Sequence, residues 1–578
     1  MHVTARENKK NESKVVLKMS SDENNTSVKK TEEAPPVTDF ENPLANLILK
    51  KFPNATIAFA NPDRTRVNVS KEEIIQTASF IRDELHFDHA ESVSGVDYPD
   101  EKQIEVVYHL GSYDDPSLSK QILTLATRVP REDNPHPGND STKLSSLYEI
   151  FPSVAFHERE CFEMLGVYFE GNPDNRRLLL PEDWADIPPL RKDFDIKGRK
   201  KMSAKLPPGL QLEKVDDRIM TLNVGPQHPG SGHMRIIIKV DGDYIVHTDP
   251  DPGYVHRGEE KMAEYRNYIT NIPHLERPVI HDSCNILYPY CLGIEELLGL
   301  EVPERAKYLR VIAAELNRCV YIQYWLAIYG IFLGHSTMFM WPTGDRELLI
   351  DLLEKMTGAR VTHAYFVPGG IRNDVPPNFE DVCLRQVNYF EKRIKEYADV
   401  FYDNPILISR TRDTGVLSRE DAIKLGTTGS VLRASGVDFD IRKKEPYDVY
   451  DELDFQSPTL KEGDSYARSK IPWLDMFESC RIIRDALKKM PKSGSVRVKL
   501  KPKPKGGDTE IYRRVESGRG SLGMYIVSKG KPQPYRLKMS VGSFRNLIAM
   551  PHLLTGEKLG NMPAVYWSLN YWPVEADR

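Results

Sequence analysis

Alternating apolar and polar residues predict a mixture of strands and helices in the first part of the chain. Lys71–Leu85 repeats apolar residues at helical spacing after Ser70, a good capping residue, and a second helix is predicted over Ser145–Leu165. The mixture predicts a small α+β domain that ends near Asp195. The predicted strands are Thr56–Phe59, Ile104–Leu110 and Gln121–Val129.

The second part opens with strands and then becomes helical. Ile219–Val224 reads as a strand, and a hairpin follows in which Arg235–Val240 and Asp243–His247 flank Asp241-Gly242, a strong turn signal. Long apolar faces then predict three helices. These helices are Glu304–Phe332, Asp345–Met356 and Asp381–Ala398.

Composition changes divide the chain into four segments. Residues 1–40 are rich in Lys, Glu, Asn and Ser, which predicts a disordered tail. Residues 41–195 form the small domain, and residues 196–216, basic and poor in apolar residues, form a linker. A larger domain covers residues 217–578. Within it, the basic, Pro-rich run Lys499–Gly507 is predicted to be an exposed loop rather than a nucleic-acid site.

The charge balance and the longest apolar run limit the classes of protein to consider. Lys plus Arg number 79 against 84 Asp plus Glu, a formal net charge of -5, which argues against nucleic acid as a partner. The longest apolar run, Trp325–Leu333, is shorter than the ~20 residues of a membrane span. Met1–Lys18 is polar and basic, unlike a signal peptide. We expect a soluble, cytoplasmic chain.

The cysteine pattern argues against a metal cluster held by this chain alone. Six cysteines occur, and no two form a Cys-x-x-Cys pair, whereas iron–sulfur and zinc sites draw thiolates from close spacings. Scattered thiols suit a reducing compartment, where they act as small buried apolar side chains. They are Cys161, Cys284, Cys291, Cys319, Cys383 and Cys480.

One loop carries candidate proton chemistry. The chain contains no Walker loop, G-x-G-x-x-G fingerprint, H-E-x-x-H helix or G-x-S-x-G elbow, so nucleotide binding and the common hydrolase mechanisms are disfavoured. The segment Gly225–His233 has two prolines and three glycines, and carries His228 and His233. Histidine exchanges protons near neutral pH, as a redox site requires. The alternative is a structured loop with a solvated histidine.

Two charged segments allow either docking or a solvated surface. His256–Glu264 reads as a helix start, with Glu259 and Glu260 in the first turn, where they suit the helix dipole. A solvated charged face is the simpler interpretation. In the small domain, Glu158–Glu163 places several acids on one helix, and charged segments anchored by proline follow it. These segments suit docking on another subunit better than catalysis; they are Asn175–Arg177 and Asp186–Lys192.

Taken together, the motifs from Asp217 onward are specific enough to name a family. Val255–Arg266 resembles the signature of the D-type chain of respiratory complex I, its large hydrogenase-like subunit. Further motifs agree with that subunit in the same order along the chain. They are Gly225–Pro229, Ala314–Arg318, Gly358–Arg360, Pro368–Gly370, Leu432–Gly436, Pro446–Asp451, Gly463-Asp464, Gly523–Tyr525 and Asp577-Arg578.

The small domain resembles the C-type chain of the same enzyme. Asn172 stands where that signature usually has His or Lys. A C-like domain fused ahead of a D-like one is a known arrangement in this family, so each half supports the other. The matching motifs are Glu158–Glu160, Glu163, Gly166, Arg177–Leu179 and Pro189–Phe194.

The resemblance implies a fold and a function. The fold is α+β: a small α/β domain followed by a large, mainly helical, nickel–iron-hydrogenase-like domain with an N-terminal β hairpin. The chain is then a peripheral-arm subunit of a proton-pumping NADH:quinone oxidoreductase-like translocase of the respiratory electron-transport chain, active only within the complex.

The resemblance also implies cofactors and partners. Electrons pass from a 4Fe–4S cluster in a small iron–sulfur partner to quinone between the two subunits. This chain binds neither NAD nor a metal itself, and no segment resembles a site for NADH, deazaflavin or ferredoxin. Its other partners are membrane-arm and further peripheral-arm subunits, not nucleic acid. It lies as a peripheral membrane protein on the cytoplasmic side of the cell membrane.

Carried over by position, the family's quinone site is only partly preserved. His228 matches the family's loop histidine, and His233 substitutes for a second one in a loop one residue shorter. Downstream of Arg277, the family's quinone-binding tyrosine falls on Ile280. The family's aspartate that pairs with the loop histidine falls on Phe332.

These replacements suggest a rebuilt headgroup site. The resemblance gives His228 and His233 the catalytic role, and we hypothesise that His233, His281 or Tyr288 holds the headgroup, or that the acceptor is not an ordinary ubiquinone. For His281 the alternative is a core histidine. Replacing His281 and His233 in turn tests the idea, because unchanged quinone reduction in both variants would contradict it.

Two other functions fit parts of the sequence. A nickel–iron hydrogenase needs two Cys-x-x-Cys pairs as soft ligands, but the first pair falls on Val279 and Asp282, and the segment 572–578 contains no cysteine. A non-catalytic assembly scaffold of a membrane-bound redox complex is the second alternative, favoured by the lost tyrosine and aspartate. Pocket variants of a scaffold would lose assembly rather than turnover.

Overall fold

A computed structural model describes most of the chain. The predicted tail and most of the predicted linker lie outside the described residues, so the proposed domain boundaries stay a prediction. We call residues 42–198 the first half and residues 218–578 the second half. The described ranges are 42–132, 142–198, 218–228 and 232–578.

The first half is built on a five-stranded sheet in the order β1-β2-β5-β4-β3. β2 and β5 run parallel, and the other neighbours are antiparallel. The three predicted strands are confirmed. The elements are α1 (Pro43–Lys51), β1 (Thr56–Ala60), β2 (Arg64–Val69), α2 (Ile74–Asp83), β3 (His89–Tyr98), η1 (Pro99–Glu101), β4 (Gln103–Gly111), β5 (Ile122–Pro130), β6 (Lys143–Ser145), η2 (Pro152–Val154), α3 (Ala155–Leu165) and β7 (Tyr168–Glu170).

Two predicted helices begin later than expected. Helix α2 begins at Ile74, because the Ser70 hydroxyl binds the Glu73 carboxylate at 3.2 Å instead of a backbone N–H. Helix α3 begins at Ala155 rather than Ser145. The backbone before it is held in turns by the buried Glu158, whose carboxylate accepts the Leu147 N–H at 3.0 Å.

Helix α3 lies directly on strand β3 at a glycine. A Cβ on Gly95 would come within 2.0 Å of Leu165 Cδ1 and 3.2 Å of Cys161 Sγ. This close approach therefore requires glycine, and it fixes the height of α3 above the sheet.

The second half contains three sheets and a group of long helices. The hairpin is confirmed as part of a three-stranded sheet in the order β10-β9-β8. The elements of the second half up to α9 are β8 (Ile219–Val224), β9 (Arg235–Asp241), β10 (Tyr244–Asp251), α4 (Glu259–Ala263), α5 (Ile272–Leu275), η4 (Arg277–Asp282), α6 (Ser283–Leu298), α7 (Glu304–Phe332), α8 (Ser336–Thr357), β11 (Phe366–Val367), β12 (Gly370–Ile371) and α9 (Phe379–Tyr397).

Short helices and a long hairpin complete this half. Helix α7 has the predicted bounds, whereas α8 begins at Ser336 rather than Asp345 because the helix continues through Pro342. The remaining elements are η5 (Ala398–Tyr402), α10 (Pro405–Thr411), α11 (Arg419–Lys424), α12 (Ser430–Ala434), α13 (Ile441–Lys444), η6 (Tyr450–Glu452), α14 (Ser465–Lys489), β13 (Asp508–Ser517), β14 (Gly520–Lys529), β15 (Arg536–Ser540), α15 (Gly542–Leu547), α16 (Ala549–Leu554), η7 (Leu559–Asn561), α17 (Met562–Ser568) and α18 (Pro573–Asp577).

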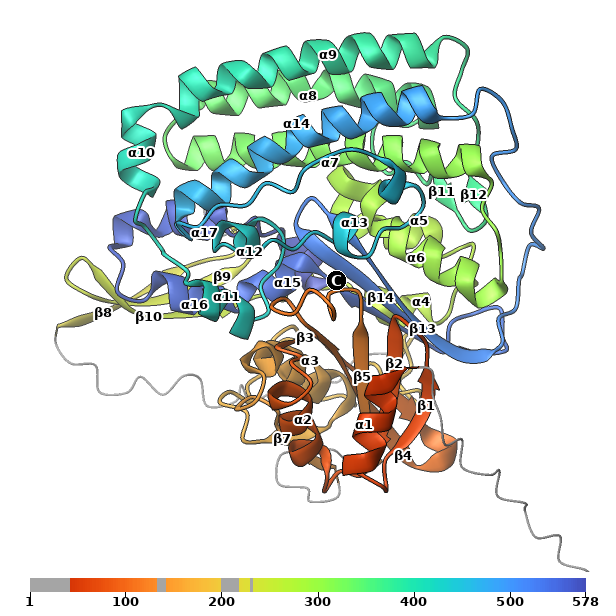
Figure 1. The fold of residues 1–578 in the computed structure, drawn as a ribbon. Coiled ribbons are helices and arrows are strands. Elements are labelled where there is room, and N and C mark those ends of the chain that lie inside the picture. Colours follow the sequence, from red (N-terminus) through yellow and green to blue (C-terminus); the bar gives the residue numbers. More distant parts are fainter. Residues whose placement is uncertain (1–41, 133–141, 199–217, 229–231) are drawn as a thin grey trace, which may run out of the picture. The chain divides into compact units, whose positions relative to one another are not determined.

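The long helices form a layer, and a sheet lies between this layer and the first half. Helices α7, α8, α9 and α14 run side by side (Figure 1), and the antiparallel sheet β13-β14-β15 separates them from the first-half sheet. The predicted loop Lys499–Gly507 connects α14 to β13 without regular structure, as expected.

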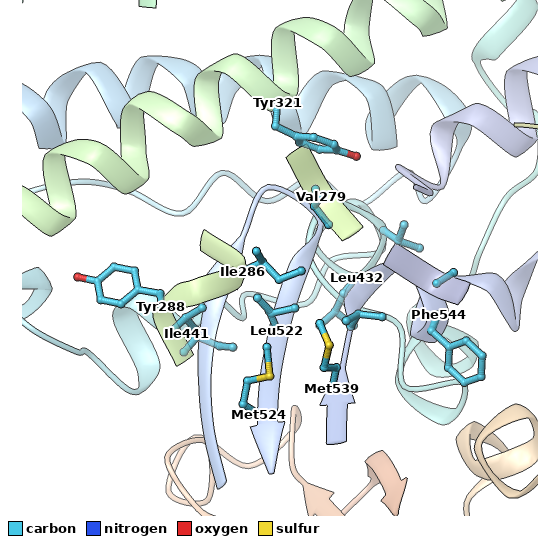
Figure 2. Close-up of a cluster of buried hydrophobic side chains, with 14 of the residues drawn as sticks. Val279, Ile286, Tyr288, Tyr321, Leu432, Ile441, Leu522, Met524, Met539 and Phe544 are labelled. Carbon is cyan, nitrogen blue, oxygen red and sulfur yellow. The ribbon is translucent and has the colours of Figure 1, made fainter. Parts of the chain in front are cut away.

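The core of the second half is formed where helices meet this sheet. Figure 2 shows Leu522 and Met524 of β14 and Met539 of β15 beneath side chains from the helices. Val279 and Tyr321 lie at one end of this cluster, close to the site described next. All of these side chains are buried.

Candidate functional site

The loop between β8 and β9 carries the two predicted catalytic histidines. His228 and His233 lie on either side of the part of this loop that is outside the description, residues 229–231. His228 and His233 are both exposed, and the His228 N–H donates to the Gly225 carbonyl at 3.0 Å. His233 has a φ of 66°, in the left-handed region, so the backbone turns sharply just before β9 begins.

A glycine seats this loop against the aromatic segment Tyr566–Pro573. Gly232 has a φ of 58°, and a Cβ there would lie about 3.2–3.3 Å from three side chains. The loop therefore approaches α17 and α18 more closely than a larger residue permits. The three side chains are Trp567, Tyr566 and Pro573.

His281 lies at the other end of the same segment. It occupies η4, half-buried, with its ring stacked on Tyr324 at 4.2 Å between centroids and facing the edge of Trp572 at 6.1 Å. Burial, aided by Arg346 and Arg519, lowers the pKa of His281 to about 4. The imidazole is therefore neutral at pH 7, with one nitrogen as donor and one as acceptor.

The two residues that depart from the family pattern also lie on this site. Phe332 stacks on Trp567 with centroids 4.9 Å apart and planes 8° apart. Ile280, next to His281, is 38% exposed. The structure thus places Gly232 of the loop against Trp567 and His281 against Trp572, and it has apolar side chains at both replaced positions.

Tyr288 is not brought to this surface. It is fully buried, its hydroxyl donates to Asp448 at 2.6 Å, and its ring packs edge-on against Phe366 and Tyr447. In Figure 2 its hydroxyl points away from Val279 and Tyr321. Burial raises the pKa of Tyr288 well above its usual value. We therefore leave Tyr288 out of the proposed site.

Behind His281 lies a buried ionic cluster that the sequence did not reveal. Arg519 Nη2 donates to Asp282 Oδ2 at 3.0 Å, and its Nε donates to Glu575 Oε2 at 2.7 Å. None of the three side chains is exposed. The fold thus brings Asp282 close to Glu575 of the segment 572–578, with a guanidinium between their carboxylates. Arg519 stands in the turn between β13 and β14, far from both in sequence, and no motif signals it.

The charged motif of α4 is buried, so the interpretation as a solvated face is wrong. Glu260 accepts hydrogen bonds from Arg536 Nη2 at 2.8 Å and the Met539 N–H at 3.1 Å. Although burial opposes it, the charges of Lys538, Arg536 and Arg578 hold the pKa of Glu260 down to about 2. The cost of burying the acid is thus offset by partners on β15 and at the end of the chain.

The acids of α3 also bind within the chain. Glu160 accepts hydrogen bonds from Lys538 Nζ at 2.6 Å and Arg578 Nη2 at 2.8 Å. Of the charged segments predicted to dock on another subunit, Arg176 pairs with Asp249 at 2.6 Å, so this docking occurs inside the chain. We call the contacts of Glu160 and Arg176, and all others that join residues 42–198 to residues 218–578, the half-to-half interface.

The six cysteines are buried and unpaired, as predicted. Burial raises the pKa of the Cys161 thiol to about 12, so it stays protonated. Within the described ranges, no three His, Cys, Asp or Glu side chains gather closely enough to hold a metal ion. Over those same residues, no helix combines the length and apolar character needed to cross a membrane.

Comparisons with known proteins identify relatives for both halves. Residues 67–200 match the family model described as the respiratory-chain NADH dehydrogenase 30 Kd subunit, and residues 333–505 and 500–578 match that of the 49 Kd subunit. The C/D chain of the Phocaeicola vulgatus NADH-quinone oxidoreductase is 32% identical over 530 residues, covering 89% of this chain and 99% of the relative. The D chain of the Geobacillus thermodenitrificans NADH-quinone oxidoreductase is 39% identical, covering 62% of this chain and 98% of the relative.

One solved structure resembles the second half. A chain of the membrane-bound sulfane sulfur reductase, an archaeal respiratory membrane complex, matches with a TM-score of 0.61 and 35% identity. The match covers 63% of this chain and all of that one.

Proposed function

The chain belongs to the family of fused C/D chains of NADH-quinone oxidoreductase, and from this premise we propose that it forms a quinone-reducing site in a complex I-type enzyme. As a member of this family it is an oxidoreductase subunit of complex I. Electrons would reach quinone from a 4Fe–4S cluster in a small partner subunit, and the reaction would drive proton pumping in the membrane arm.

The observation that carries this proposal is that the histidine-bearing loop, through Gly232, and His281 both lie against the segment Tyr566–Pro573. The glycine-seated loop reaches Trp567, and His281 lies against Trp572 on the same segment. Aromatic faces and edges bind flat ring systems, and neutral imidazoles donate hydrogen bonds to carbonyl oxygens. A quinone headgroup presents both a flat ring and two carbonyls.

Each histidine has a distinct role in this proposal. His281, held neutral, donates a hydrogen bond to one quinone carbonyl without adding a charge. His228 and His233, on the solvent-facing loop, exchange protons with solvent while the loop approaches the headgroup. The iron–sulfur partner would supply the electrons, since this chain's thiols are buried and protonated.

We infer the partners and location from the same premise. The partners are the small iron–sulfur subunit, other peripheral-arm subunits and membrane-arm subunits, and the chain would sit peripherally on the cytoplasmic face of the cell membrane. The family relationship supports this arrangement.

A non-catalytic scaffold is the second candidate. Ile280 and Phe332 replace the polar residues of the family's site, and Phe332 is held in a stack with Trp567. In that case the histidines would contribute to packing only. Variants at His228 and His281 would then weaken assembly of the complex and leave turnover per assembled complex unchanged.

Purification from native membranes tests the proposal. The tagged chain is isolated after gentle solubilisation, its partners are identified by mass spectrometry, and the complex is assayed with quinone and with polysulfide as acceptors. We expect a small iron–sulfur subunit, multi-span membrane subunits and quinone reduction that falls in His228→Ala and His281→Phe. A lone chain, or reduction of polysulfide but not quinone, would contradict it.

A further inference from the structure

The cluster of Asp282, Arg519 and Glu575 carries an excess negative charge in the protein interior. Two carboxylates flank one guanidinium, and all three side chains have no exposed surface. Burying an uncompensated charge is costly, and buried carboxylates relieve the cost by taking up a proton. Burial accordingly raises the pKa of Asp282.

The surrounding polar groups do not neutralise this excess. Arg318 of α7 is paired with Glu315 at 3.1 Å and donates to two backbone carbonyls. Tyr321 lies over Arg519 and donates its hydroxyl to Asn570 at 2.7 Å. Asp282 also accepts hydrogen bonds from Asn285 Nδ2 at 2.5 Å and the Gly518 N–H at 3.3 Å, and Glu575 accepts the Ser543 N–H at 3.3 Å, but these donors carry no charge. Tyr571, Asp577 and His281 also face the cluster.

The cluster is linked to the proposed quinone site. Asp282 directly follows His281 in η4. On the other side, the Ser543 hydroxyl donates to Glu575, and the Trp572 N–H donates to Ser543 Oγ at 3.0 Å. Trp572 in turn presents its ring edge-on to His281. Both carboxylates are therefore connected to His281, Asp282 through the backbone and Glu575 through Ser543 and Trp572.

Several buried polar atoms around the cluster have no hydrogen-bond partner among the described residues, and the two that concern the proton path are Glu575 Oε1 and His281 Nδ1. The others include Arg519 Nη1, Tyr571 Oη and Asp577 Oδ1. Buried polar atoms in proteins are generally satisfied by ordered water, which also conducts protons between them. An acceptor on the acid and a ring nitrogen on the histidine are the two ends that such a water would join.

We propose that Asp282 and Glu575 share one proton and that this cluster supplies it, through His281, to a quinone oxygen. The inference rests on the proposed function. Quinone takes two electrons, one at a time, from the partner's iron–sulfur cluster, which is oxidised at each transfer and re-reduced by the complex between them; it also takes two protons, and two O–H bonds form. One proton leaves a carboxyl O–H of the cluster, which is reprotonated from water; the other comes from solvent by way of the loop histidines. His281 accepts at one nitrogen, releases from the other, and ends unchanged.

The test uses the complete membrane complex carrying Glu575→Gln or Asp282→Asn. We measure kcat and KM for quinone from mildly acidic to mildly alkaline pH, and separately follow reduction of the partner's cluster by EPR. Loss of a proton donor should lower kcat roughly 10- to 100-fold, increasingly so at alkaline pH, with KM and cluster reduction unchanged. Glu575→Asp, which keeps a carboxyl group, should restore part of the rate.

Glu295→Gln is the matched control. Glu295 is a buried acid paired with the buried Arg310, and it lies about 18 Å along α6 from Ser283, the residue after Asp282. It should cost stability without changing the pH profile of turnover. Wild-type kcat and pH profile in both cluster variants would overturn the inference, as would a rate loss of the same size at every pH. If Glu575→Gln fails to assemble, Asp282→Asn decides by the same criterion. Failure of the proposed function is distinct, because the wild-type complex would then not reduce quinone.

Discussion

The half-to-half interface and the histidine site use charged and titratable groups in opposite ways. At the interface, Glu160 is buried with two cations, and Glu91 accepts from Tyr512 at 2.9 Å and binds Arg514. At the site, His281 is kept neutral with an unpartnered ring nitrogen among the described residues. Pairing of these interface acids rigidifies one region, whereas the unpaired nitrogen of His281 suits the other to the proposed binding and proton exchange.

The apolar part of the interface reinforces this contrast. Side chains from the first-half sheet pack against those of β13 and β14 in one buried cluster, so ion pairs there are shielded from solvent. The site has exposed apolar groups such as Ile280 instead. The members of the cluster are Val96, Tyr98, Val107, Ile122, Ala126, Tyr512, Tyr525 and Val527.

The largest effect on stability should come from breaking a buried interface pair. Glu160→Gln leaves Lys538 and Arg578 without this counter-charge in the interior, which should lower the free energy of unfolding by about 3–5 kcal/mol. Chemical denaturation of the full chain measures it. Asp114→Asn, which breaks the exposed pair with Arg419 between the same halves, should cost at most about 1 kcal/mol. Equal losses of unfolding free energy in the two variants would show that burial does not strengthen the interface pairs.

A smaller loss is expected at Tyr288. Tyr288→Phe removes the hydroxyl bound to Asp448, and should cost about 1–2 kcal/mol of unfolding free energy. Because the side chain is buried away from the histidines, KM for quinone should not change. A raised KM for quinone in a fully assembled complex would show that Tyr288 contributes to quinone binding.

His281 should give a measurable pH dependence of stability. Its pKa is about 4 in the folded chain and near 6.5 when unfolded, so the unfolded state binds more protons between these values. Stability should therefore fall as pH drops from about 6.5 towards 4. Thermal unfolding of the wild type and of His281→Phe is measured across this pH window. The part of the pH dependence that comes from His281 should be absent in the variant. Parallel curves would show that His281 is not held neutral by its surroundings.

The smallest effect on stability should accompany a clear effect on function. His228 is exposed, so His228→Ala should change the free energy of unfolding by no more than about 0.5 kcal/mol. Quinone reduction should nevertheless fall, because the loop loses a proton-exchanging group. The control is His552→Ala, an exposed histidine on α16 beside Asp421, which should leave turnover unchanged. Equal turnover in the two variants would argue for the scaffold.

Local pattern was sufficient wherever neighbouring residues determine the structure. The bounds of α7 follow from its long apolar face, and Asp241-Gly242 fixes the hairpin between β9 and β10. The loop histidines were proposed in the same way, from an unusual run of glycine and proline, and their role stays a prediction. Helix starts were less predictable. The Glu158 side chain accepts a hydrogen bond from the Leu147 N–H, so this part of the backbone, which the periodicity assigned to α3, is not helical.

Long-range partners could not be predicted. Glu260 has the pattern of a solvated acid because its partners, Arg536 and Lys538, lie on a strand near the other end of the chain. Arg519 carries no local signal, yet it joins Asp282 to Glu575. Charges are paired by the fold, and a single sequence does not record which ones meet.

Joining the two halves in one polypeptide has a consequence for how the interface forms. The D chain of the Geobacillus thermodenitrificans enzyme matches 62% of this chain over 98% of its own length, so that relative does not carry the rest of this chain in the same polypeptide. Here, both partners of an interface ion pair, Glu160 and Lys538, belong to one polypeptide. Docking is then a first-order event whose yield does not depend on protein concentration, and the two halves are always made in equal amounts.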